Sequence, residues 1–290
     1  MVAVCCVGDL LVDVVVRLER DPQRGTDTPA AISFRQGGSA ANVARAVVAS
    51  GGEARFVGQV GNDAHGRLLI DELHEAGVEV HAATNGITGT AVVLVDPTGE
   101  RSFLTDRAAA LHLSSVRTEV LDGIDVLHVP AYSLVAGALA ETTQMLIGEA
   151  VDRSISITVS TSSTAVLADY GRSQFMELLR AIQPEVIIAN SDEARFLLEG
   201  RPWFRQASAT VVTAGPGVAR FTQPDGTDVR VQPEPFEPSD TTGAGDAFTG
   251  GFIVSYQETG DPTESLTAGH RRARHTLTES SRLLPTEFTP

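Results

Sequence analysis

The stretch Asp-Thr-Thr-Gly-Ala-Gly-Asp-Ala-Phe-Thr-Gly-Gly at residues 240–251 decides which fold and which chemistry we expect. Gly243 and Gly245 bracket the predicted start of a helix that runs to about residue 256. Glycines allow backbone N–H groups to converge at a helix N-terminus, where the helix dipole favours an anion. Asp246 falls in the first turn, where a carboxylate can accept a proton from a substrate hydroxyl while the amides stabilise a transferring phosphoryl group. The alternative is an ordinary glycine-rich turn capped by an aspartate.

Two further strings carry polar residues at the start of predicted helices. Residues 37–44, Gly-Gly-Ser-Ala-Ala-Asn-Val-Ala, place a glycine pair where a ligand can approach the backbone, with Asn42 one turn into the helix. Alone, this string also fits a plain helix junction. Asn190-Ser191-Asp192-Glu193 follows a buried run and by itself fits a common helix start, with Asn190 as N-cap and Glu193 as its capping-box partner.

Short runs rich in Val and Ile alternate with longer amphipathic stretches along the chain. The runs predicted as buried strands are 2–7, 54–60, 126–129, 155–159, 186–189 and 210–213. The stretches predicted as helices are 40–50, 66–76, 136–151, 172–182 and 191–198. This alternation predicts an α/β fold with a mostly parallel central sheet and helices on both of its faces.

Two regions break the alternation and predict a small antiparallel β sheet beside the main one. They pair residues 11–18 with 30–34, and 90–96 with 101–105, the second pair around a Pro-Thr-Gly-Glu turn at 97–100. Such a sheet can cover a pocket as a lid. We therefore expect one domain over residues 1–290, with a lid formed by about residues 11–36 and 88–106.

Charge and composition exclude several classes of protein. A net charge of −15 argues against a nucleic-acid partner, because phosphate backbones require a basic face. No apolar run is long enough for a membrane span, and residues 1–8 resemble a first strand rather than a leader, so we expect a cytoplasmic protein without a membrane partner. The two adjacent cysteines, Cys5 and Cys6, predict buried thiols on a core strand, and no Cys/His cluster has zinc spacing.

The 22 basic residues are all arginine, and the chain contains no lysine. This excludes mechanisms that require a Schiff-base lysine or the lysine of a P-loop. A Rossmann oxidoreductase is also excluded, because no Gly-x-Gly-x-x-Gly follows the first strand. If the protein binds ATP, backbone amides, arginine and a metal ion must hold the phosphates.

Together, the strings at 37–44, 190–193 and 240–251 resemble the signatures of the ribokinase-like (PfkB) carbohydrate kinase family. The resemblance covers nearly the whole chain, from Gly8-Asp9 to the last helix. It implies the ribokinase-like three-layer fold and an ATP- and Mg²⁺-dependent transfer of a phosphoryl group to a hydroxyl of a sugar or nucleoside. Such a transfer depends on positioning and charge stabilisation more than on covalent catalysis. It also implies a homodimer, because lid sheets of this family often pair.

The resemblance assigns roles residue by residue. It implies that Asp246 is the catalytic base and that Gly243, Ala244 and Gly245 shape the anion hole. The residues expected at the sugar are Asp13, Gly37, Gly38, Asn42 and Arg107. The residues expected at the nucleotide are Asn190, Thr213, Gly215, Gly217 and His270, with Glu193 at the metal. Arg107 fits equally well as a solvated arginine.

The final helix departs from the family pattern. Residues 268–282 carry four arginines and two histidines where family members usually have small apolar residues, and the family's Gly-Ala turn is missing. Adenine packing and the monovalent-cation site of some relatives, to which Asp240 and Thr242 would contribute, are therefore open. Ser160-Thr161-Ser162-Ser163 stands where relatives often carry Asp or Asn. The alternative to an active kinase is a catalytically weakened member that binds a sugar or nucleotide as a regulatory protein.

Overall fold

The computed structural model describes residues 1–236 and 241–282, with side chains as far as residue 279. Its main sheet has nine strands in the order β13-β12-β11-β10-β9-β8-β1-β4-β5. The strands of this sheet are β1 (Ala3–Val7), β4 (Glu53–Val60), β5 (Glu79–Thr84), β8 (Val126–Pro130), β9 (Ser156–Ser160), β10 (Val186–Asn190), β11 (Ala209–Thr213), β12 (Ala219–Thr222) and β13 (Asp228–Val231). All strands from β11 across to β5 run parallel, and β12 and β13 add an antiparallel edge.

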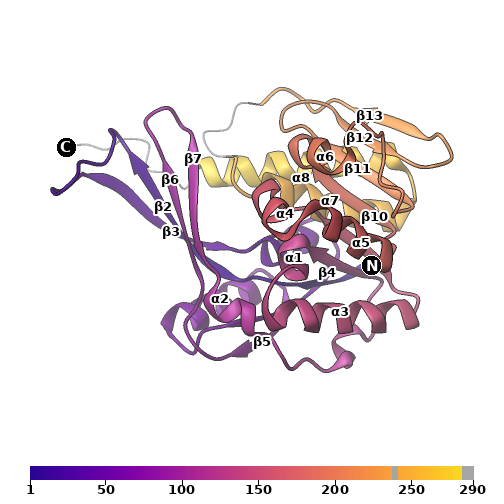
Figure 1. The fold of residues 1–290 in the computed structure, drawn as a ribbon, viewed down its shortest axis with the longest axis horizontal. Helices are drawn as coiled ribbons and strands as arrows, with labels where there is room; N and C mark the ends of the chain where they lie inside the picture. The colour runs from indigo at the N-terminus through magenta and orange to yellow at the C-terminus, as the bar shows by residue number, and fades with distance from the viewer. Residues whose placement is uncertain (237–240, 283–290) are drawn as a thin grey trace.

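Helices cover both faces of this sheet (Figure 1). The helices are α1 (Ser39–Ala49), α2 (Ala64–Glu75), α3 (Gly137–Asp152), α4 (Thr164–Tyr170), α5 (Arg172–Ile182), α6 (Ser191–Leu198), α7 (Ala244–Thr259) and α8 (Pro262–Arg282), with short 3₁₀ turns at Ala108–His112, Thr118–Leu121 and Ala131–Leu134. One buried apolar cluster joins the sheet to α3, α4, α5 and α6, and a second joins it to α1, α2, α7 and α8. The three-layer α/β fold expected from the sequence is confirmed.

A second sheet of four strands projects from one end of the main body (Figure 1). Its strands, in the order β3-β2-β6-β7, are Ala30–Gly37, Leu11–Leu18, Thr90–Val95 and Arg101–Asp106. The pairs β2–β3 and β6–β7 are antiparallel, as predicted, and the two pairs meet in a parallel pairing of β2 with β6. The turn after β6 is held by Asp96, whose side chain accepts from the backbone of Thr98 and Glu100.

Most predicted strands and helices are present, with ends that differ by one or two residues. The two cysteines are free and buried on β1, as expected. Burial raises the pKa of the Cys5 thiol to about 12, so it is an unreactive core side chain. None of the helices in the described part of the chain has the length and apolar character that a membrane span requires.

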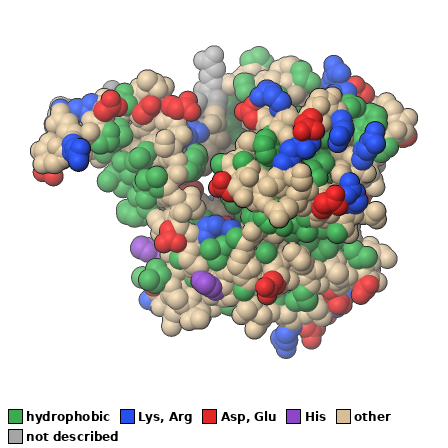
Figure 2. Space-filling model, viewed as in Figure 1, with side chains coloured by type: hydrophobic (Ala, Val, Ile, Leu, Met, Phe, Trp, Pro, Cys, Tyr) green, Lys and Arg blue, Asp and Glu red, His purple; other side chains and the backbone are tan. Residues whose placement is uncertain are grey.

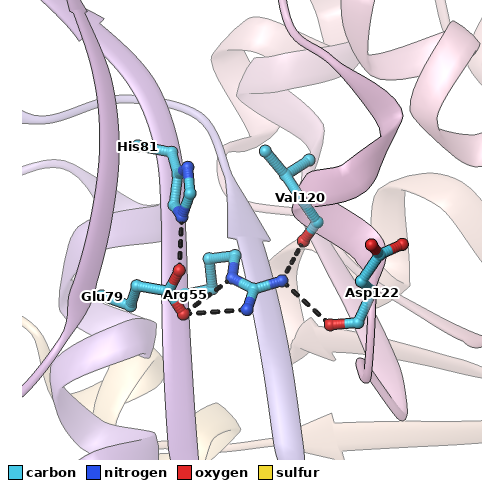
Figure 3. A network of polar contacts seen from close by, with 5 residues as sticks. All are labelled: Arg55, Glu79, His81, Val120 and Asp122. Atoms are coloured by element: carbon cyan, nitrogen blue, oxygen red, sulfur yellow. Dashed lines mark hydrogen bonds and ion pairs between the residues drawn. The ribbon is translucent and has the colours of Figure 1, made fainter.

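A polar network fastens the β4–β5 edge of the sheet to the loop around residue 120 (Figure 3). Arg55 donates to Glu79 Oε2 at 2.8 and 2.9 Å and to the carbonyl oxygens of Val120 at 2.6 Å and Asp122 at 3.1 Å. His81 contacts the other Glu79 oxygen at 2.6 Å. The hydrogen bonds from His81 and Arg55 lower the pKa of Glu79, so the carboxylate stays charged at neutral pH. Arg55 thus satisfies two loop carbonyls far from the carboxyl ends of the strands.

Candidate active site

Polar residues from several segments gather where the parallel strands of the main sheet end. Gly8 and Asp9 follow β1, Tyr132 follows β8, Thr161 follows β9, and Asn190 ends β10. The N-termini of α1 and α7 reach the same edge, because Ser39 and Asn42 contact Asp246. In open α/β sheets, ligands bind outside the carboxyl ends of the strands. The strand ends therefore form the frame of a candidate active site.

Asp246 lies in the first turn of α7 and is held by the first turn of α1. Ser39 donates its hydroxyl to Asp246 Oδ1 at 2.7 Å, and Asn42 donates its amide to Oδ2 at 2.9 Å. Gly243, the N-cap of α7, has φ 77°, a left-handed conformation that glycine adopts without strain. The carboxylate is thus fixed in orientation beside a helix N-terminus that points backbone N–H groups at the same space.

Burial raises the pKa of Asp246 to about 6, and the negative charge of Glu193 adds to this effect. The hydrogen bonds from Ser39 and Asn42 favour the ionised carboxylate and limit the rise. A carboxyl group with a pKa near 6 is ionised at neutral pH but more basic than an exposed aspartate. This is the property that a general base requires.

Gly37 and Gly38 lie so close to the segments that carry Asp13 and Asp9 that neither position has space for a Cβ atom. A Cβ added to Gly37 would lie 2.0 Å from Asp13 Oδ1, and one added to Gly38 would lie 2.2 Å from the carbonyl oxygen of Asp9. Gly38 also has φ +100°. Asp13 lies in β2 of the small sheet, and the structure brings it beside Gly37, another residue expected at the sugar.

Arg107, predicted at the substrate, is bound by a residue that the sequence analysis did not single out. Its guanidinium forms a two-point ion pair with Asp9, with both N–O distances at 2.7 Å. The side chains are only 13% and 6% exposed, so the reading of Arg107 as a solvated arginine is wrong. The guanidinium also lies 5.7 Å from the centroid of the Tyr132 ring. Burial raises the pKa of Tyr132, a hydrogen bond with Ser163 opposes this rise, and the charges of Asp246, Glu193 and Asp9 add to it.

The Asn190–Glu193 string forms the capping box of α6. Asn190 donates its side-chain amide to Glu193 Oε1 at 2.7 Å, while Glu193 Oε2 accepts from the Thr161 hydroxyl at 2.6 Å and from the Asn190 backbone at 3.0 Å. Glu193 is 5% exposed. Thr161, in the segment where relatives often carry an acid, thus holds the buried Glu193 carboxylate in place.

The loop after β11 and the middle of α8 form the remaining part of the candidate site. Thr213 ends β11 and pairs with Asn190 of β10, and its carbonyl accepts from Ser191 Oγ at 3.0 Å. Gly215, with φ 56°, and Gly217 shape the loop that follows. His270 packs edge-on against the Phe248 ring at 5.2 Å, with its Nε2 buried and unpartnered.

Comparison of the sequence with known protein families identifies one family. The family model "pfkB family carbohydrate kinase" matches residues 1–287. The chain is a pfkB-family carbohydrate kinase. It is 30% identical over 296 residues to an ATP-dependent ribose-1-phosphate kinase of Halopiger xanaduensis, an alignment that covers 94% of each chain.

Solved structures share the fold of this kinase. The adenosine kinase from Sinorhizobium meliloti superimposes with a TM-score of 0.83 at 23% identity, covering 96% of this chain and 94% of that one. A putative ribokinase II from E. coli, in complex with ATP and Mg²⁺, gives a TM-score of 0.78 at 21% identity and covers 92% of this chain and 89% of that one.

Two arginines of the final helix of this kinase lie at the surface, and a third, Arg272, is largely buried. Leu266, Gly269 and Leu277 are buried in α8, and Gly269 lies against the Phe248 ring of α7. Arg271 is exposed, and Arg274 pairs with Glu234 at the surface. Arg272 differs from these two: its side chain is only 12% exposed, its Cβ lies against Gly251 of α7, and it donates to the carbonyl oxygen of Ala49 at 3.4 Å. The helix therefore packs on α7 through small residues and through the stem of Arg272.

The metal prediction for this kinase rests on Glu193, and the cation prediction rests on Asp240 and Thr242. Within residues 1–236 and 241–282, no group of three or more His, Cys, Asp or Glu side chains is arranged to hold a metal ion by itself. Asp240, expected at a monovalent-cation site, lies outside the described residues. Mg²⁺ typically takes one or two carboxylates and completes its shell with water and substrate phosphates, so the single Glu193 carboxylate near Asp246 fits such an ion.

Sequence reasoning did not single out Ser39, Asp9 or Thr161 as site residues. Ser39 stands inside the quoted string at 37–44, and its place three residues before Asn42 puts both on one face of α1, which is a signal that could have found it. Asp9 pairs with Arg107, 98 residues away, and Thr161 with Glu193, 32 residues away. A local sequence pattern does not indicate such pairs.

Proposed function

We propose that this kinase transfers the γ-phosphoryl group of ATP to a hydroxyl of a sugar or nucleoside, with Asp246 as the base. The observation that carries the proposal is the Asp246 carboxylate, fixed by Ser39 and Asn42 at the N-terminus of α7 with its pKa raised to about 6. The attacking hydroxyl would give its proton to Asp246 as its oxygen bonds to the γ-phosphorus and the bond to the β,γ-bridging oxygen breaks. ADP would leave with that bridging oxygen.

The start of α7 would stabilise the charge that develops on the transferring group. Because the first N–H groups of a helix have no partner within the helix, those of Gly245 and Asp246 are suited to bind phosphate oxygens. The N–H of Ala244 already donates to the carbonyl of Thr241 at 3.3 Å, so we assign it the lesser share. Mg²⁺ near Glu193 would neutralise phosphate charge, as expected from the donor set described above.

The nucleotide and sugar would occupy opposite sides of Asp246. We assign the nucleotide to Asn190, Thr213, Gly215, Gly217 and His270, because His270 presents a buried, unpartnered Nε2 beside an aromatic ring. We assign the sugar to Asp13, Gly37, Gly38 and Asn42, with Arg107 acting through its contact with Tyr132.

The small sheet would act as a lid of the single kinase domain. Arg101 of β7 donates to the Thr241 hydroxyl at 2.6 Å, so the β6–β7 hairpin already touches the glycine-rich loop. Asp13 and Arg101 lie in rows of the sheet that share one face, which is therefore turned towards the candidate site. A cover of this kind excludes water from a transferring phosphoryl group.

A coupled ADP-release assay with Mg-ATP tests the proposed function. The panel would contain ribose, ribose 1-phosphate, fructose, keto-deoxy sugar acids and adenosine, which include the substrate classes named for the relatives. Turnover that depends on one class of compound would support the proposal and name the substrate. Absence of turnover with every compound, together with absence of ATP binding by calorimetry, would favour a regulatory binding protein instead.

The pH dependence of the reaction is expected to follow Asp246. The carboxylate must be ionised to accept a proton, and its raised pKa is about 6. As pH falls through 6 the carboxylate is protonated, so kcat/KM is expected to fall about tenfold for each further pH unit, and to level off above about pH 7. Initial rates at saturating Mg-ATP from pH 5 to 8.5 measure this profile. A flat profile down to pH 5 would contradict the assignment of the base.

We also propose that the lid sheet pairs with that of a second copy. Its outer face carries a row of apolar side chains, Phe34, Val14, Val92 and Leu104, in which Phe34 is 67% and Leu104 59% exposed. Figure 2 shows hydrophobic side chains gathered on this sheet. Light scattering is expected to give twice the chain mass, and Phe34→Asp to give a single chain mass with an unchanged circular dichroism spectrum. A monomeric parent protein would refute the pairing.

A further inference from the structure

A second pocket, apart from the candidate active site, lies between α6 and the antiparallel edge of the main sheet. Its volume is about 480 Å³, within the range of pockets that hold small molecules. The lining residues come from α6, the loop after it, β11, β12 and β13: Ser191, Ala194, Arg195, Leu198, Gly200, Arg201, Pro202, Val212, Ala214, Val218, Arg220 and Arg230. Asp246 and the residues that hold it are not among them.

Four arginines line this pocket and no carboxylate does. Arg220 and Arg230 share one carboxylate, that of Asp228, at distances between 2.8 and 3.3 Å. Arg195 pairs with Asp192 at 2.7 Å, and both side chains are 75% exposed. The side chain of Arg201 has no hydrogen bond or ion pair with any described residue. Four guanidinium groups are therefore matched by only two carboxylates, and the pocket carries an excess of positive charge.

This charge stands out against the composition of the chain. Acidic residues outnumber basic ones by 37 to 22, and the net charge is −15. Figure 2 shows blue side chains gathered over the part of the molecule where Figure 1 places α6 and β11 to β13. A basic concavity in an acidic protein opposes the general negative field, so it attracts anions that the rest of the surface repels.

The floor of the pocket is apolar. Ala194 and Leu198 of α6 are buried, and Val212 of β11 packs against the same apolar cluster as α6. Val218, which is 40% exposed, forms part of the wall. A ligand that fits this lining has an anionic end and a small uncharged body. Arginine forms two-point hydrogen bonds with phosphate, and a dianion matches the excess charge of the pocket.

We propose that this pocket is a binding site for a small organic phosphomonoester, separate from the catalytic cleft. The pocket adjoins the loop after β11, but its apolar floor lies on the face of the sheet opposite α7. Val212, which lines the pocket, belongs with the cluster that contains α6, whereas its neighbour Val211 belongs with the cluster that contains α7, the helix of Asp246. Successive residues of a strand point to opposite faces, so the apolar floor of the pocket and α7 are divided by the sheet.

Calorimetric titration with phenyl phosphate tests the site, because this probe joins a phosphate dianion to a small apolar body. Saturable binding of one molecule at the pocket is expected in the parent protein, and Arg201→Gln is expected to raise its Kd at least about tenfold. Arg201 is exposed and its side chain has no partner among the described residues, so its replacement leaves no carboxylate unpaired. Arg230→Gln, which leaves Arg220 on Asp228, is expected to act in the same direction.

Matched controls separate this site from general attraction and from the active site. Arg180→Gln removes an exposed arginine of α5 outside the pocket and is expected to change Kd by less than about twofold. Phenol, which lacks the phosphate, is expected not to bind. Unchanged affinity in both Arg201→Gln and Arg230→Gln, equal weakening by Arg180→Gln, or equal binding of phenol would each overturn the proposal. Activity is not needed for any of these readouts, so the inference stands or fails independently of the proposed function.

Discussion

Asp246→Asn is expected to lower kcat by about a thousandfold while leaving the fold intact. Removing a positioned general base typically costs a factor of 10² to 10⁴ in rate. Asparagine has nearly the same shape as aspartate, so Ser39 and Asn42 still enclose it, but an amide oxygen cannot take the proton of the substrate hydroxyl. The KM for ATP is expected to change little, because the backbone amides of α7 remain in place. Steady-state kinetics with the substrate found in the panel measure both constants.

Asp71→Asn is the matched control for this variant. Asp71 is an exposed residue of α2 with the same chemistry and no assigned role, so its replacement is expected to leave kcat within about twofold. A kcat within tenfold of the parent in Asp246→Asn, in a protein with an unchanged unfolding midpoint, would show that the attacking hydroxyl loses its proton without Asp246. The phosphates themselves would then be the acceptor.

The central part of the fold was predictable because its strands are buried on both faces. Val4, Val126 and Val186 lie in β1, β8 and β10, where parallel pairing and helices on each side require continuous apolar runs. The strands that the sequence analysis missed are β5 and β13, which form the two edges of the main sheet, and β12, which pairs with β13. An edge strand has one unpaired side and needs no apolar run, so residues 79–84 and 228–231 carry charges that hid them.

Some residues of the candidate site were predictable from short stretches of sequence, whereas the contacts between them join residues far apart in the chain. Asp246, Asn42 and Glu193 stand in short strings whose spacing alone predicts a helix start and a carboxylate beside it. The contact between Asp246 and Asn42 joins residues 204 apart, and only the shared edge of the sheet brings them together. The small sheet was predictable as two hairpins, but the parallel pairing of β2 with β6 was not, because it depends on how the hairpins meet.

The final helix, α8, packs on α7 although it is rich in basic residues. Four arginines and two histidines suggested a disturbed interior, yet Leu266, Gly269 and Leu277 of α8 are buried, and the half-buried His270 packs against Phe248 of α7. Residues separated by three, four or seven positions share a helix face. Arg271 and Arg274 lie at the surface, whereas Arg272 is largely buried beside Gly251 of α7 and pairs with Glu279.

Asp9→Ala is expected to lower the free energy of unfolding by about 3 kcal/mol. The pair with Arg107 is almost completely buried, and removing one partner of such a pair leaves a charge without compensation in the interior. Arg107 also stacks on Tyr132, so it cannot easily turn to solvent. Urea unfolding followed by circular dichroism measures the change, with the slope against denaturant expected to stay the same.

The double variant Asp9→Ala/Arg107→Met tests whether the unpaired Arg107 guanidinium causes the loss of stability in Asp9→Ala. If the cost comes from an unpaired guanidinium, removing Arg107 as well is expected to recover most of the lost stability, since methionine fills similar apolar space. If the two single changes instead add in the double variant, the residues contribute independently and Asp9 does not hold Arg107 in place. A recovered fold together with a raised KM for the sugar would indicate that the buried pair positions the substrate pocket rather than stabilising the protein. Asp9 and Arg107 would then contribute to substrate binding, because replacing both would leave the free energy of unfolding nearly unchanged but weaken binding of the sugar.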